Sequence, residues 1–226
     1  MSLMYQRPPV SDIYSLLRTS NSLIVHFSGI APGTGNPGER LYYPDDLRNV
    51  VTGGAMGGVS CSVISPGDIF GQTENNNNAT GCVGVVLGLL SPSSLLDVHA
   101  GDGGSTVLPN GQRDANPKSL NLTDLQETIT GRHRGTYNEW VVGNYKVLGI
   151  FIAAPCMVRA IVDIPAPPGV PANILGNSRG PGICYETIND VQRDFPDQRI
   201  FRFNVREIQE VNSSVWVHAP HNTIYF

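Results

Sequence analysis

A cysteine and a histidine in the middle of the chain have the residue types that nucleophilic attack on an amide needs. Cys82 follows Gly81 and opens an apolar run, and His99 closes the next apolar run. A thiol is a good nucleophile only as a thiolate, and an adjacent histidine can accept its proton and stabilise the anion. The backbone N–H groups of Gly81 and Cys82 can form an oxyanion hole, because glycine lets a substrate approach the main chain. These residues predict acyl-transfer chemistry.

The two apolar runs that carry these side chains are expected to be strands. Cys82–Leu87 and Ser94–His99 are short and rich in β-branched or large apolar residues, which is typical of strands. A structural role for Cys82 is the alternative, because free cysteines are among the most buried residue types and usually act as small hydrophobic side chains.

A hairpin of these strands has two possible registers. A loop over Gly88–Ser93 puts Cys82 directly opposite His99, with Cβ atoms roughly 4.5–5.5 Å apart, close enough for a thiol–imidazole hydrogen bond. A loop over Ser91–Ser94 puts His99 opposite Val86 and separates the pair. The residues allow both registers.

The segment around Cys82 resembles a family of bacterial Cys–His glutamine deamidases. Gly81–Val86 and Val98–Ala100 look like the corresponding strands of the chemotaxis glutamine deamidases. The wider pattern resembles the toxin deamidases of the Burkholderia lethal factor and cytotoxic necrotizing factor type. In the lethal factor type a Ser-Gly-Cys motif corresponds to Thr80-Gly81-Cys82, and an Ala-Gly-Asp-Gly-Gly run like Ala100–Gly104 lies before the histidine, whereas here it follows it.

Earlier parts of the chain extend this resemblance. The lethal factor type begins with a short helix and a strand, similar to Ile13–Arg18 and Ser22–Phe27, and has a Pro-Gly step like that within Ile64–Ile69. The resemblance covers about the first half of the chain. It implies a layered α+β sandwich.

The resemblance also implies a function, which is deamidation of a glutamine side chain on a protein substrate without a cofactor. Cys82 would be the nucleophile, His99 the proton carrier, and the amides of Gly81 and Cys82 the oxyanion hole. The family has a threonine six residues before its cysteine, where this chain has Asn76. Asn76 or Thr80 is therefore the expected third member. The resemblance implies action in the bacterial cytoplasm or after delivery into a host cell.

Composition narrows the class of protein. The chain has 226 residues, fits one domain over 1–226, and has a formal net charge of −4, which gives no electrostatic reason to bind nucleic acid. No apolar run reaches the length of a membrane span, and no signal-peptide pattern opens the chain. Residues 1–10 are expected to be a loose arm, with Met1-Ser2-Leu3 typical of a cloning remnant. Four sparse cysteines suggest reduced thiols.

The expected elements describe an α+β fold, a layered sandwich of mixed or antiparallel sheets with a few short helices on one side. About four helices are expected, and the strands outnumber them. The helices are Asp12–Arg18 capped by Ser11, Pro44–Val51, Leu122–Ile129 capped by Asn121, and Glu186–Phe195. The strands besides the two above are Leu23–Phe27, Val59–Ile64, Trp140–Val142, Tyr145–Ala153, Cys156–Ile164, Ile200–Val205 and Val215–His218, with a terminal strand over Thr223–Phe226.

Two other functions fit the residues. The same Cys82 and His99 can run transglutamination, or cut a peptide or thioester bond, because the chemistry is shared up to the acyl-enzyme. A non-enzymatic β-rich assembly domain is the second alternative, in which the terminal strand Thr223–Phe226 adds to a neighbour's sheet edge. No metal site is expected, because His218 and His221 have too few further ligands nearby.

Overall fold

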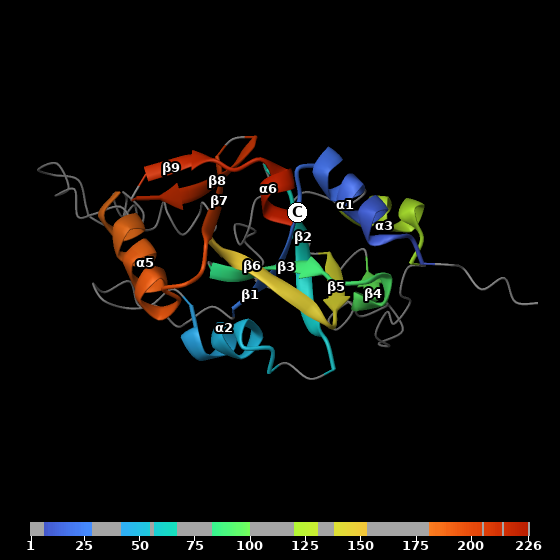
Figure 1. Cartoon of the computed structure of the whole chain (residues 1–226), viewed down its shortest axis with the longest axis horizontal. Helices are drawn as coiled ribbons and strands as arrows, with labels where there is room; N and C mark the ends of the chain where they lie inside the picture. Colours follow the sequence, from blue (N-terminus) through green and yellow to red (C-terminus); the bar gives the residue numbers. More distant parts are fainter. Residues whose placement is uncertain are drawn as a thin grey trace, which may run out of the picture.

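The structure is a computed structural model that describes residues 7–28, 42–54, 57–66, 83–99, 120–130, 138–152, 181–204, 206–213 and 215–225. Within these ranges the predicted α+β class is confirmed, since helices pack around one mixed β-sheet of nine strands (Figure 1). The helices are α1 (Val10–Thr19), α2 (Pro44–Val51), α3 (Leu122–Thr130), α5 (Pro181–Asp194) and α6 (His221–Tyr225). The strands are β1 (Leu23–Phe27), β2 (Val59–Ile64), β3 (Val83–Leu89), β4 (Leu95–His99), β5 (Glu139–Val142), β6 (Tyr145–Ile152), β7 (Ile200–Asn204), β8 (Glu207–Asn212) and β9 (Val215–His218).

The strands lie in the order β4-β5-β2-β1-β3-β6-β7-β8-β9. Every neighbouring pair is antiparallel except β6 and β7, which are parallel. The predicted hairpin of β3 with β4 is therefore wrong. β3 pairs with β1 and β6, and β4 pairs with β5 at the end of the described sheet.

Burial explains why β3 and β4 separate. Every residue of Val83–Leu89 is buried, whereas in β4 only Leu95 and Val98 are buried and the other three residues are partly or fully exposed. A continuous apolar run is typical of a central strand covered on both faces, and partial exposure is typical of a strand that is in contact with solvent. β3 thus takes a neighbour on each side from elsewhere in the chain, and β4 goes to the margin.

Ser94 stabilises the turn between β3 and β4 through two hydrogen bonds. The short 3₁₀ turn Pro92–Ser94 follows β3, and the Ser94 hydroxyl donates to the Asn144 carbonyl at 2.7 Å. The Gly143 N–H donates to the Ser94 carbonyl at 2.8 Å. The β3–β4 and β5–β6 connections consequently lie against each other, so the sheet bends back on itself at this corner.

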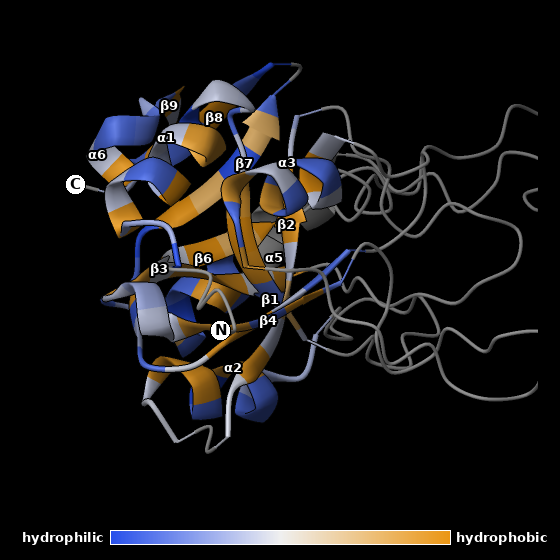
Figure 2. Cartoon of the chain, turned by 90° about the vertical axis from the view of Figure 1, so that its right-hand side faces the viewer, coloured by the Kyte–Doolittle hydropathy of each residue, from blue (hydrophilic) through white to orange (hydrophobic). Residues whose placement is uncertain are grey.

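Apolar side chains fill the interior on the faces of this bent sheet. Figure 2 shows the central strands mostly in orange, with the orange sides of α1 and α2 turned toward them. Trp140 is fully buried, and its indole N–H donates to the Thr128 hydroxyl of α3 at 2.9 Å. Cys61 in β2 is buried as predicted.

The ends of some helices differ from the prediction. α1 begins at Val10 after Pro9, which has no side-chain cap hydrogen bond, so Ser11 lies inside the helix and does not cap it. The Asn121 cap of α3 is confirmed, because its Oδ1 accepts the Asp124 N–H at 2.9 Å. The Arg7 guanidinium donates to the Leu95 carbonyl at 2.9 Å, so the expected loose arm is held from Arg7 onward.

The C-terminal part contains two further differences. β8 was not predicted, because Glu207–Asn212 combines apolar and charged residues without a long apolar run. The predicted strand Thr223–Phe226 is wrong, since His221–Tyr225 forms α6. A run of four residues is too short for periodicity to separate helix from strand. The predicted strand Cys156–Ile164 lies outside the described residues.

Candidate functional site: a carboxylate–histidine pair on β4

His99 and Asp97 form a side-chain pair at the end of β4. They are two residues apart on one strand, so their side chains leave the same face of the sheet. The His99 Nε2 atom lies 3.1 Å from Asp97 Oδ2. The His99 side chain is 12 % exposed and that of Asp97 is 39 % exposed. The imidazole is thus mostly shielded while the carboxylate reaches the surface.

The backbone holds the carboxylate in place. Asp97 Oδ1 accepts a hydrogen bond from the Val98 N–H at 2.9 Å, so both carboxylate oxygens have a defined partner. An ionised carboxylate only accepts hydrogen bonds, and Nε2 must therefore carry the proton in this contact. In the neutral ring Nδ1 is then the basic nitrogen. A carboxylate that fixes the tautomer of a histidine is the arrangement by which a general base is oriented.

A third side chain faces this pair from the neighbouring strand. Glu139 of β5 is directly opposite His99 in the β4–β5 ladder. Directly opposed residues have Cβ atoms roughly 4.5–5.5 Å apart on the same face. Two carboxylates and one imidazole therefore share one end of the sheet, and together they can accept and donate protons.

The predicted nucleophile lies outside the described residues, as do Gly81, Thr80 and Asn76. Of the predicted site residues the structure describes His99 alone. Because the β3–β4 hairpin is absent, strand pairing does not bring Cys82 and His99 together.

The registers show how far apart the two strands are. His99 pairs with Glu139, the β2–β5 register continues to Ser62, and Ser62 pairs with Val25, which pairs with Val86. His99 thus lies in the same row as Val86, with three strands between them. Four strand spacings amount to roughly 19 Å measured along the sheet. Because the sheet bends back at the β3–β4 corner, this path is not the direct distance between the two strands.

Cys61 is the cysteine whose side chain is described, and it is not a nucleophile. It is 1 % exposed, and its thiol donates to the Val59 carbonyl at 3.4 Å. Burial raises the pKa of the Cys61 thiol far above its usual value, and the charge of Glu139 adds to the rise. A buried thiol of this kind stays protonated and unreactive.

Asp97 is the residue of this candidate site that the sequence prediction missed. The sequence prediction places the third member before Cys82, at Asn76 or Thr80. A signal was present in the sequence, since an acidic residue two positions from His99 on an expected strand must share its face.

The described residues hold neither a metal-binding cluster nor a membrane-spanning helix. Among them, no three His, Cys, Asp or Glu side chains are grouped closely enough to hold a metal ion. No helix in the same ranges is long and apolar enough to cross a membrane. Comparison of the chain with protein-family models, with curated proteins and with solved structures gives no match.

Proposed function

We propose that the chain is a Cys–His amidohydrolase that deamidates a glutamine side chain of a protein substrate. The observation that supports this proposal is the Asp97–His99 pair, in which a carboxylate holds the imidazole in one tautomer and leaves Nδ1 as a base. The resemblance of Gly81–Val86 to the glutamine deamidases supplies the nucleophile, Cys82. On this proposal the third member is Asp97, in place of Asn76 or Thr80.

The proposed reaction has two halves. His99 Nδ1 takes the thiol proton of Cys82, and the thiolate attacks the carboxamide carbon. The resulting oxyanion is held by the backbone N–H groups of Gly81 and Cys82. The tetrahedral intermediate collapses with cleavage of the C–N bond, and the imidazolium gives its proton to the departing ammonia. Water, deprotonated by His99, then cleaves the thioester to glutamate and restores the thiol.

Asp97 has a positioning role in this scheme. Its carboxylate stabilises the imidazolium that forms twice in each cycle and keeps Nε2 protonated when the ring is neutral. Exchanging the corresponding carboxylate for an amide in serine proteases leaves the geometry intact but favours the wrong tautomer. Asp97→Asn is therefore expected to lower the reactivity of Cys82 without displacing His99.

The test is the pH dependence of Cys82 alkylation by iodoacetamide, read by peptide mass spectrometry. In the wild-type protein we expect rapid labelling at pH 6–7. His99→Ala should slow it on the order of a hundredfold, and Asp97→Asn on the order of tenfold, because the thiolate loses its cation or the ring its orientation. The fully buried Cys61 serves as the slow internal reference.

A second histidine gives a matched control. His218 is exposed on β9, with Nδ1 3.7 Å from a Glu207 carboxylate oxygen, so it too is a histidine beside an acid. His218→Ala should leave the labelling of Cys82 unchanged. If Cys82 reacts as an ordinary thiol with a midpoint near pH 8.5 in every variant, the nucleophile assignment is wrong. Ammonia release from a glutamine-bearing protein, abolished by Cys82→Ser, then separates deamidation from transglutamination, which incorporates an added amine.

A second candidate function, self-assembly without catalysis, is favoured by β9. This strand is the outermost described strand beyond β8, and Val215 and Val217 on one of its faces are 59 % and 38 % exposed. An unpaired edge can add a strand from a second copy. Sedimentation at micromolar concentration distinguishes the two functions, because an assembly domain forms dimers that Val217→Lys disperses, whereas Cys82 labelling is indifferent to that change.

A further inference from the structure

The last described helix is attached to the body of the protein through a buried histidine. His221 is the first residue of α6 and is 7 % exposed. Its Nε2 lies 3.0 Å from the Ser22 carbonyl oxygen, just before β1. A carbonyl only accepts, so Nε2 carries the proton in this contact. The other ring nitrogen, Nδ1, is buried and has no hydrogen-bond partner among the described residues.

The rest of α6 is attached through Tyr225. The rings of His221 and Tyr225 stack with centroids 4.6 Å apart, and Tyr225 in turn contacts the Tyr14 ring of α1 at 4.8 Å. The Tyr225 hydroxyl accepts the Ile24 N–H of β1 at 3.0 Å. Tyr225 is 1 % exposed. The helix therefore covers the start of β1 and completes the hydrogen bonding of a strand amide.

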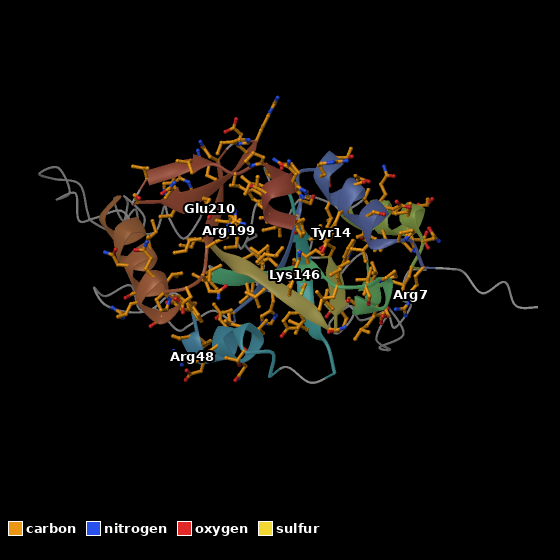
Figure 3. All side chains as sticks on the ribbon, viewed as in Figure 1. Arg7, Tyr14, Arg48, Lys146, Arg199 and Glu210 are labelled. Atoms are coloured by element: carbon orange, nitrogen blue, oxygen red, sulfur yellow. The ribbon has the colours of Figure 1, made fainter. Side chains whose placement is uncertain are left out.

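The charged groups that contact α6 or act on it directly are cations, and one of them is paired with a carboxylate. The charge of Arg18 in α1 disfavours a positive charge on His221. Lys146 Nζ of β6 donates to the Tyr225 carbonyl at 3.2 Å, and Arg199 donates to the Thr223 carbonyl at 2.9 Å while a bidentate pair with Glu210 holds its guanidinium. Figure 3 labels Tyr14, Lys146, Arg199 and Glu210 around this helix. In the part of the chain that the structure describes, no carboxylate pairs with His221.

Protonation of His221 is therefore incompatible with its place in the fold. A second proton would go to Nδ1, which has no acceptor among the described residues, and would bring a charge into a buried site where the charge of Arg18 also disfavours it. The ring cannot simply turn over, because Nε2 would then lose the Ser22 carbonyl. The Ser22 carbonyl and the Tyr225 ring favour a cation in part, but neither removes the burial of the new N–H group.

We propose that α6 is an acid-released latch on the start of β1, closed while His221 is neutral and opened when His221 is protonated. Opening moves His221 to water, exposes the ring of Tyr14 and removes the hydroxyl acceptor of the Ile24 amide. The proposal is independent of the chemistry at Cys82. It assigns the chain a second surface, built from α1 and β1, that is available only under acidic conditions.

The sign of the pH effect follows from linkage. Burial is the main reason why the pKa of His221 in the closed latch is lowered from its usual value of 6.5. A group whose pKa is lower in the closed state contributes fully to closure above pH 6.5. That contribution is lost as the pH falls below 6.5, until the pKa of the closed state is reached. The opening equilibrium constant should rise up to tenfold per pH unit in this window.

The amide hydrogen exchange of Ile24, measured by NMR between pH 7 and pH 5 and corrected for intrinsic exchange, tests the latch. We expect the protection factor of Ile24 to fall several-fold to tenfold per pH unit below pH 6.5. His221→Gln keeps a donor for the Ser22 carbonyl but cannot be protonated, so its Ile24 protection should be independent of pH. His218→Gln, at an exposed histidine close by in sequence, should retain the wild-type pH dependence.

A second measurement keeps the test decisive if His221→Gln folds poorly. The pH titration of the His221 Cε1–H signal in the wild-type protein reports the protonation of that ring directly. A midpoint below 6.5, with loss of Ile24 protection following the same curve, supports the latch. Constant Ile24 protection between pH 7 and pH 5, or a pH dependence that survives in His221→Gln, would overturn it.

Discussion

What a side chain of this protein can do depends on the residues that the sheet places next to it. Cys61 and Cys82 are both candidate nucleophiles by residue type. The structure describes Cys61, whose side chain is buried in the core and therefore cannot react with a substrate. His99 was identified from its type and spacing, but its orienting group is Asp97, two residues away on the same strand. The sequence allowed this pair to be found, because a strand assignment already implies a common face.

Partners that are distant in sequence could not be found in this way. The contact between His221 and the Ser22 carbonyl joins residues 199 positions apart, and no local pattern encodes it. Similarly, the sequence gives no sign that Trp140 needs an acceptor on α3. Such contacts depend on how the elements pack, and this is decided by the whole set of apolar faces.

The Thr128–Trp140 hydrogen bond leads to a prediction at this scale. Thr128 is fully buried and its hydroxyl accepts the Trp140 indole N–H at 2.9 Å while donating to the Leu125 carbonyl at 2.8 Å. Thr128→Val keeps the shape but leaves the indole N–H buried without an acceptor. We expect a loss of about 1–3 kcal/mol in the free energy of unfolding, measured by urea denaturation.

A neighbouring threonine provides the control for this prediction. The Thr130 hydroxyl is exposed at the end of α3 and donates to the Gln126 carbonyl at 2.9 Å. Thr130→Val should change the unfolding free energy by about 0.5 kcal/mol or less. Equal effects of the two substitutions would show that the indole contact contributes nothing specific.

At the scale of elements, most strands were predicted from local patterns, whereas their partners were not. β1, β2 and α2 have the predicted bounds, because each is a short apolar or amphipathic run between clear turn residues. The pairing of β3 with β4 failed because neighbours in sequence were assumed to be neighbours in the sheet. The unbroken burial of β3, which its composition already indicates, marks a central strand that needs two partners.

Gly84 of β3 lies so close to the neighbouring strand β1 that its position requires a residue without a side chain. A Cβ atom at Gly84 would lie 2.5 Å from both the His26 carbonyl oxygen and Val25 Cγ1 of the adjacent β1. The close packing of β1 and β3 thus explains why Gly84, within the Gly81–Val86 motif, is a glycine. Catalysis is not needed to account for it.

We therefore predict that Gly84→Ala destabilises the fold. The added methyl group must push against the backbone of β1, and overpacking of this kind costs about 1–3 kcal/mol of unfolding free energy. Gly54→Ala is the matched control, because a Cβ there meets nothing closer than the Asn49 carbonyl at 3.4 Å. Thermal and urea melts of both variants decide the matter, and a Gly84→Ala protein as stable as Gly54→Ala would contradict the close packing of β1 and β3.

At the scale of the whole molecule, the fold buries several groups that ionise at high pH. Burial raises the pKa of Tyr14 to about 12, against the opposing effect of its hydrogen bond to the Leu89 carbonyl. The pKa values of Tyr225 and Tyr145 are raised as well, chiefly by burial. These groups and Cys61 favour the folded state only in their neutral forms. The protein should therefore lose stability on the alkaline side, in steps that follow the unfolded-state pKa values.

The first of these steps belongs to Cys61. Its thiol has a usual pKa of 9.0 and is held protonated by burial in the fold, so its contribution to stability is complete below pH 9 and is lost as the pH rises. By pH 10 the loss should be about 1.4 kcal/mol, because one pH unit corresponds to 1.36 kcal/mol. The tyrosines add to the decline only above about pH 10, where unfolded tyrosine ionises.

Cys61→Ala isolates this contribution, because every other titrating group is common to both proteins. At pH 7 the variant should be less stable by roughly 1 kcal/mol, since it loses the sulfur and leaves a small cavity. Between pH 7 and pH 10 the wild-type advantage should shrink by about 1.4 kcal/mol and vanish or reverse. Urea denaturation at half-unit pH intervals measures the difference. A constant difference over this range would mean that the Cys61 thiol ionises as readily in the fold as in the unfolded chain, and that the core around β2 admits water.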